Sequence, residues 1–216
     1  MTSRVLPIFP LGSVVYPGQT IGLCIFEDRY RELLSDVQDT LEFGTYLIDG
    51  PKVAGRPFRR SPVGTIVQVM GFQPLHDGKA LVAIQGKQRF VSRKWLKDAS
   101  YPKAVIEETP CQGNSVDQEL LHSTSTAVRA LRALHSEVHL EDKLDKNAPI
   151  EGSDKAMVWQ LAALAPLSVH DQYKLLTISV PNERLEALSR LCHERFSDYQ
   201  RLINMSAQES KWSTDL

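Results

Sequence analysis

A chain of 216 residues is long enough to bury one sizeable core or two smaller ones. Hydrophobic residues make up 42% and charged residues 24%, as in ordinary soluble globular proteins. The formal net charge is −1, which gives no overall field to attract nucleic acid or an anionic membrane surface. No apolar run approaches the roughly 20 residues of a membrane-spanning helix, so we expect no membrane partner.

The three cysteines, at positions 24, 111 and 192, are odd in number and far apart. They form neither a CxxC pair nor a disulfide framework, which favours a reducing, cytoplasmic location. Cys24 lies in an apolar run and Cys192 on an apolar helical face. We therefore expect both to be buried as small hydrophobic side chains.

Residues 1–110 are expected to form a β-rich domain. Runs of β-branched and alternating residues between glycines and prolines predict strands at 5–9, 20–25, 43–48, 64–70, 80–84, 89–92 and 101–107. One helix after Phe26 is predicted from the helical spacing of Tyr30, Leu33, Leu34 and Val37. The pair Asp77-Gly78 predicts a type I′ hairpin turn. Many short strands with one helix favour a small closed or nearly closed barrel, and hence an α+β chain.

Residues 115–205 are expected to form a helical domain after a polar linker. The first long helix is predicted to bury one face, formed by Val116, Leu120, Ala127, Leu131, Leu134 and Val138. A second helix over 155–165 ends at Pro166, and a capping box at Ser168 opens the third. The last helix carries an apolar stripe at Leu185, Leu188, Cys192, Phe196 and Tyr199. Residues after Met205 are expected to fray.

No motif for catalysis is present. The chain lacks the GxxxxGK[ST] phosphate loop and the GxSxG nucleophile elbow. His135 and His139 have a spacing that can bind a metal from one helix face, but histidines near a helix C-terminus are favourable without one. We therefore expect no enzyme, no metal site and no cofactor.

The order of motifs in the β-rich half resembles the N-terminal substrate-binding domain of Lon proteases. FPLG begins at Phe9, PG at Pro17 and IFEDRY at Ile25. There follow FG, VGT, DG, GKQRF and YPKAV, which begin at Phe43, Val63, Asp77, Gly86 and Tyr101. Each motif is weak alone, but this order over about a hundred residues is specific.

The resemblance implies a PUA-like pseudo-barrel followed by a helical bundle, and a role in recognising unfolded or damaged polypeptide. Lon proteases carry this domain ahead of an ATPase and a peptidase. Because this chain ends at Leu216 without the motifs of either, a stand-alone binding protein is expected. Its partners would be unfolded polypeptide or a separate protease or ATPase component. The matched positions look like fold determinants: Phe9, Pro10, Leu11, Phe26, Glu27, Arg29, Tyr30, Gly44, Gly64, Arg89 and Phe90.

Two sets of contact residues are predicted. Peptide contact on an apolar surface is expected first near four aromatic residues, Tyr16, Tyr46, Phe58 and Phe72. The alternative is an RNA-binding module, because PUA-like barrels elsewhere bind RNA. Its candidates are basic residues with aromatic neighbours, Arg56, Arg59, Arg60, Arg93 and Lys94. Polypeptide is favoured, since the overall charge gives RNA binding no support.

Overall fold

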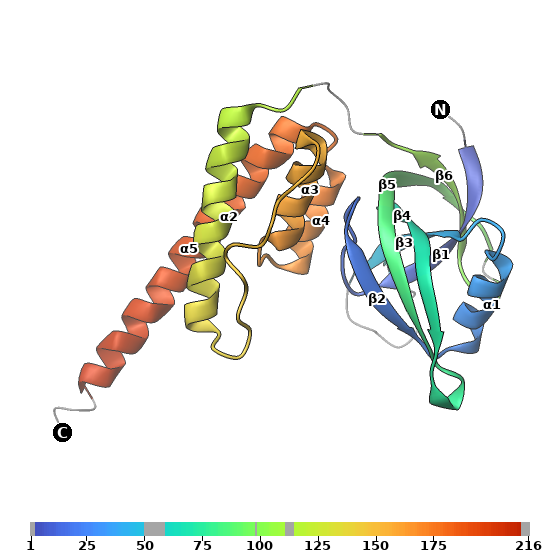
Figure 1. The fold of residues 1–216 in the computed structure, drawn as a ribbon, viewed down its shortest axis with the longest axis horizontal. Coiled ribbons are helices and arrows are strands. Elements are labelled where there is room, and N and C mark those ends of the chain that lie inside the picture. The colour runs from blue at the N-terminus through green and yellow to red at the C-terminus, as the bar shows by residue number, and fades with distance from the viewer. Residues whose placement is uncertain (1–2, 50–58, 98, 111–114, 213–216) are drawn as a thin grey trace. The chain divides into compact units, whose positions relative to one another are not determined.

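A computed structural model describes residues 3–49, 59–97, 99–110 and 115–212, except for the side chains of residues 49, 59, 77 and 206–212. The chain divides into two compact units, Met1–Gln112 and Gly113–Leu216. The first unit is rich in strands and the second is helical (Figure 1), which confirms the expected α+β class. None of the helices described is both long enough and apolar enough to cross a membrane.

A β-barrel makes up the first unit. Its strands are β1 (Ser3–Leu11), β2 (Thr20–Ile25), β3 (Glu42–Asp49), β4 (Arg59–Pro74), β5 (Ala80–Trp95) and β6 (Lys103–Glu108). The helix α1 (Asp28–Asp36) follows β2, and the 3-10 turn η1 (His76–Gly78) joins β4 to β5. The sheet order is β2-β5-β4-β3-β1-β6, and β5 also pairs with β6. Five strands therefore close into a ring, and β2 is attached to the ring through β5.

The predicted break between the strands at 80–84 and 89–92 is wrong, because β5 runs unbroken from Ala80 to Trp95. A Cβ atom at Gly86 would lie 2.2 Å from the Tyr16 carbonyl oxygen. Gly86 therefore permits a close backbone approach and does not end the strand.

The predicted β4–β5 hairpin is confirmed, but its turn is not a two-residue type I′ turn. Pro74 lies opposite Ala80, so residues 75–79 form the connection around η1. Gly78 adopts a φ of 69°, a left-handed conformation that glycine tolerates. The Arg31 guanidinium donates a hydrogen bond of 2.9 Å to the Gly78 carbonyl oxygen and ties the turn to α1.

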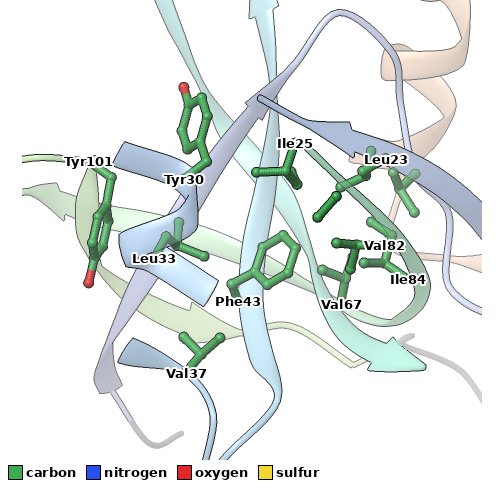
Figure 2. Close-up of a cluster of buried hydrophobic side chains, with 12 residues drawn as sticks. Leu23, Ile25, Tyr30, Leu33, Val37, Phe43, Val67, Val82, Ile84 and Tyr101 are labelled. Carbon is green, nitrogen blue, oxygen red and sulfur yellow. The ribbon is translucent and has the colours of Figure 1, made fainter. Parts of the chain in front are cut away.

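One buried cluster fixes α1 and β2 on the ring. Figure 2 shows side chains from α1 and from β2, β3, β4 and β5 converging around Phe43 and Leu33, both 0% exposed. A second cluster surrounds the buried Phe90. A Cβ atom at Gly64 would lie 2.5 Å from the Phe90 ring, so this glycine lets the ring fill the barrel. The helical stripe predicted for α1 is confirmed, with Leu34 partly buried.

The second unit contains α2 (Gln118–Val138), α3 (Asp154–Leu164), α4 (Val169–Thr177) and α5 (Pro181–Trp212). As predicted, Ser168 caps α4, and its hydroxyl accepts a hydrogen bond of 3.2 Å from the Asp171 amide. The predicted fraying after Met205 is wrong, since α5 continues through a run of good helix formers.

The buried face of α2 differs in part from the predicted one, since Val116, Leu131 and Leu134 are buried as predicted. Its buried residues are Leu121, Thr124, Val128, Leu131, Arg132 and Leu134. Leu120, Ala127 and Val138 are only partly buried. Adjacent apolar residues such as Leu120 and Leu121 leave the helical phase open in the sequence, and packing against α5 selects one of them.

Candidate functional site

A groove of about 590 Å³ is lined by the last residues of β1 and of β2. We call it the β1–β2 groove. The start of α1, the end of β3 and the start of β4 complete its walls. Its lining residues are Phe9, Pro10, Leu11, Leu23, Cys24, Phe26, Glu27, Arg29, Tyr30, Tyr46, Ile48, Arg60 and Pro102.

The floor of the groove is apolar, and the large side chain of Phe26 is exposed at its edge. The Phe9 ring packs on Tyr30 with ring centroids 4.3 Å apart. Phe26 is 62% exposed, although the family resemblance predicts it as a fold determinant. The strand alternation explains this correction. Leu23 and Ile25 point into the core, so the next residue along the chain points away from it.

The charged groups at the start of α1 are paired with each other. Arg29 Nη2 lies 2.7 Å from Glu27 Oε2, and the Arg29 guanidinium lies 4.6 Å from the centroid of the Tyr30 ring. Glu27 and Arg29 therefore form an ion pair at the start of α1. Burial raises the pKa of Tyr30 to about 12, so its phenol stays protonated and able to donate. The groove thus offers donors and acceptors beside apolar side chains.

The structure brings the two predicted basic segments together at Trp95. The guanidinium of Arg60 lies 4.8 Å from the centroid of the Trp95 ring, and Tyr46 packs edge-on against the same ring at 5.0 Å. Lys94 precedes Trp95 and is exposed. Arg93 pairs with Glu107 of β6 at 2.5 Å. Arg56 and the side chain of Arg59 lie outside the described residues.

The predicted aromatic contacts do not form one surface. Tyr46 lines the β1–β2 groove, although it is only 5% exposed. Tyr16 is 1% exposed and therefore does not belong to the accessible surface. Phe58 lies outside the described residues. Phe72 is 60% exposed and lines a different pocket of about 340 Å³, formed with Arg31, Leu34, Ser35, Val37, Gln38, Leu41 and Val69.

The expectation that Cys24 is buried is wrong, because it is exposed and lines the groove. The alternation of β2 predicts this exposure, since Leu23 and Ile25 point inward and the residue between them points outward. Cys192 is buried as expected, and burial raises the pKa of its thiol to about 12. The contributions of Phe9, Leu11 and Phe26 to the groove were not predicted.

The histidine pair of α2 is engaged within the helical unit. His135 Nδ1 lies 2.9 Å from the Tyr199 hydroxyl, and His135 Nε2 lies 3.2 Å from Asp142 Oδ2. The rings of His135 and His139 pack with centroids 4.4 Å apart. Across the described part of the chain, no group of three or more His, Cys, Asp or Glu residues is arranged to hold a metal ion.

Comparison with known proteins gives one consistent family. The model of the ATP-dependent protease La (LON) substrate-binding domain matches residues 5–194. A Lon protease of Phenylobacterium zucineum is 24% identical over 227 residues, which cover 98% of this chain and 28% of that protein. Lon protease 2 of Bdellovibrio bacteriovorus is 26% identical over 204 residues, covering 87% and 24% respectively. The chain thus spans about a quarter of the length of these relatives.

Solved structures agree with this assignment. A Lon N-terminal domain protein from Xanthomonas campestris is similar at 29% identity and a TM-score of 0.62, covering 86% of this chain and 96% of that one. The N-terminal domain of the Mycobacterium avium complex Lon protease has the same TM-score at 15% identity, covering 88% and 98%. The second likeness supports the fold alone.

Proposed function

Because the chain belongs to the LON substrate-binding domain family, we propose that it binds extended or partly unfolded polypeptide and has no catalytic activity of its own. The observation that carries the proposal is the β1–β2 groove, where the exposed Phe26 stands beside an apolar floor. Unfolded segments expose apolar side chains, and their burial in such a groove is favourable. Binding of this kind is weak and tolerant of sequence.

The polar groups of the groove support a binding role. Glu27 and Arg29 form a pair, but arginine does not release its proton at working pH and cannot complete an acid–base couple with the carboxylate. They are suited to hydrogen-bond the main chain of a ligand. We further propose a stand-alone role, in which polypeptide or a separate protease or ATPase component is the partner.

RNA binding is the alternative, and one observation favours it. The Arg60 guanidinium lies against the Trp95 ring, and the exposed Lys94 is the preceding residue. A cation beside an indole ring is a means of holding a nucleotide by phosphate contact and stacking. The same position also borders the β1–β2 groove through Arg60. The two ligands therefore compete for one region but differ in the physical force that holds them.

Fluorescence anisotropy of two labelled ligands, a reduced and carboxymethylated unfolded polypeptide and a single-stranded RNA, separates the two functions. Saturable polypeptide binding that persists as the salt concentration rises supports the proposed function. RNA binding that weakens with a log–log slope of about −0.7 per neutralised phosphate supports the alternative. If neither ligand binds, both functions are refuted, and docking to a dedicated protein partner is the remaining function.

A further inference from the structure

The strand β2 has an open edge beside the β1–β2 groove. Residues Thr20 to Ile25 pair with β5 along one side, and β2 stands at the end of the sheet order. Among the described residues, no other hydrogen bond reaches the main chain of this strand. In an antiparallel pair, alternate residues direct their N–H and C=O groups away from the partner. Within the described part of the chain, the outward main-chain groups of β2 are therefore available to a further strand.

Among residues 3–49, 59–97, 99–110 and 115–212, nothing protects this edge in the ways that proteins usually protect an exposed strand. Charged side chains, proline, bulges and covering segments normally block edge-to-edge pairing. The sequence of β2, TIGLCI, contains neither a charge nor a proline, and its pairing with β5 has no register shift. At Gly22, a Cβ atom would meet only the Leu81 side chain, at 3.8 Å. The edge is regular, and at Gly22 the described residues leave space beside the strand.

We propose that a segment of the bound polypeptide adds to β2 as an extra strand. This inference rests on the proposed function and specifies how the ligand is held. Main-chain hydrogen bonds to β2 would hold segments of many sequences, while alternate side chains provide selectivity.

Directly opposed side chains of neighbouring strands point to the same face. Ligand residues opposite Leu23 would therefore face the apolar side chains of Phe9 and Leu11, which pack against the same core cluster as Leu23. The ligand class is a polypeptide segment with apolar residues at every second position, as in a strand-forming segment of an unfolded protein. The adjoining groove, lined by Phe9, Leu11 and Phe26, supplies space for the side chains of such a segment.

Peptide N-methylation tests the main-chain contacts. A short labelled peptide of alternating valine and threonine is compared with two isomers, each N-methylated at one of the two alternating sets of residues. An added strand directs one set of amides toward β2 and the other toward solvent. We expect one isomer to bind about tenfold more weakly than the parent and the other to bind like the parent. Equal affinities of the two isomers would overturn the inference, as would failure of the parent to bind.

Disulfide trapping at Cys24 provides a geometric test. In a Cys111→Ser background, the full chain is equilibrated with oxidised glutathione and peptides that carry one cysteine at successive positions. An added strand lies about 4.8 Å from β2, within disulfide reach, so the trapping yield should alternate with a period of two residues. The control is Leu81→Cys with Cys24→Ser. Position 81 lies opposite Cys24 but one strand farther from the edge, about 10 Å from the ligand, where no disulfide can form.

The outcomes separate this inference from the proposed function. Trapping without periodicity, or equal trapping at positions 24 and 81, would overturn strand addition. The unfolded polypeptide can still bind in that case, and the proposed function would stand. Loss of all polypeptide binding would refute both. Sedimentation of the chain alone detects the remaining occupant, because dimers that the parent peptide does not dissociate would mean that a second copy covers the edge, which would also overturn strand addition.

Discussion

Replacement of Phe26 by alanine should weaken polypeptide binding about tenfold. A phenylalanine side chain has roughly 200 Å² that can be buried, and Phe26 is 62% exposed, so about 120 Å² is available to a ligand. At about 25 cal/mol per Å², complete coverage would contribute about 3 kcal/mol. A ligand in a groove that is open on one side covers about half of this area. The loss of about 1.5 kcal/mol corresponds to a tenfold weaker affinity.

The matched control is Phe72→Ala, because Phe72 is 60% exposed and lines the separate pocket of about 340 Å³ beside α1. The two wild-type side chains are exposed to a similar extent in the free protein. Each substitution should therefore change the free energy of unfolding, measured by urea denaturation, by less than about 1 kcal/mol. Anisotropy titration with unfolded polypeptide then compares the two. Unchanged affinity of Phe26→Ala, together with weakened binding of Phe72→Ala, would refute the placement in the β1–β2 groove.

Two further predictions concern the barrel that supports the groove. Gly64→Ala should lower the free energy of unfolding by about 3 kcal/mol or more, because its Cβ atom would lie 2.2 Å from a backbone carbonyl oxygen. In Gly71→Ala the nearest atom lies at 3.9 Å, so urea denaturation should show a loss below about 1 kcal/mol, and equal losses would contradict the argument. Burial raises the pKa of Glu42, but hydrogen bonds from Lys87 and Arg4 outweigh it and lower the pKa below 4.5. The stability from these bonds is complete above pH 4.5 and is lost as the pH falls through the lowered pKa, so Glu42→Gln should reduce the fall in urea midpoint on acidification.

The strands could be predicted because their signals are local. Alternating residues and turn residues mark β2 within a few positions, and its predicted bounds agree with the structure. Gly86 shows where such reasoning fails. A glycine that ends a strand and a glycine that admits a neighbouring backbone look alike in sequence, and only the approach of the Tyr16 carbonyl distinguishes them.

The groove could not be predicted in the same way, because its walls come from segments far apart in the chain. Tyr46 and Phe72 each line a pocket, but their aromatic character does not indicate that the two pockets are separate. Tyr16 shows that aromatic character alone does not indicate exposure, since tertiary packing decides it. For Phe26, continuing the alternation of β2 predicts a side chain that points away from the core. The family resemblance instead predicts a fold determinant at this position.

The groove and the open edge of β2 have one geometric origin. β1 pairs with β3 and β6, β2 pairs with β5, and no ladder joins β1 to β2 among the described residues. Pro10, near the end of β1, has no N–H to donate across this gap. The groove and the outer edge of β2 adjoin each other at Leu23 and Cys24, so the proposed added strand would use both at once. A folded ligand, whose main-chain N–H and C=O groups are already hydrogen-bonded, could occupy the groove but could not pair with the edge of β2. Strand addition at this edge would therefore favour unfolded segments over folded ones without recognition of any particular sequence.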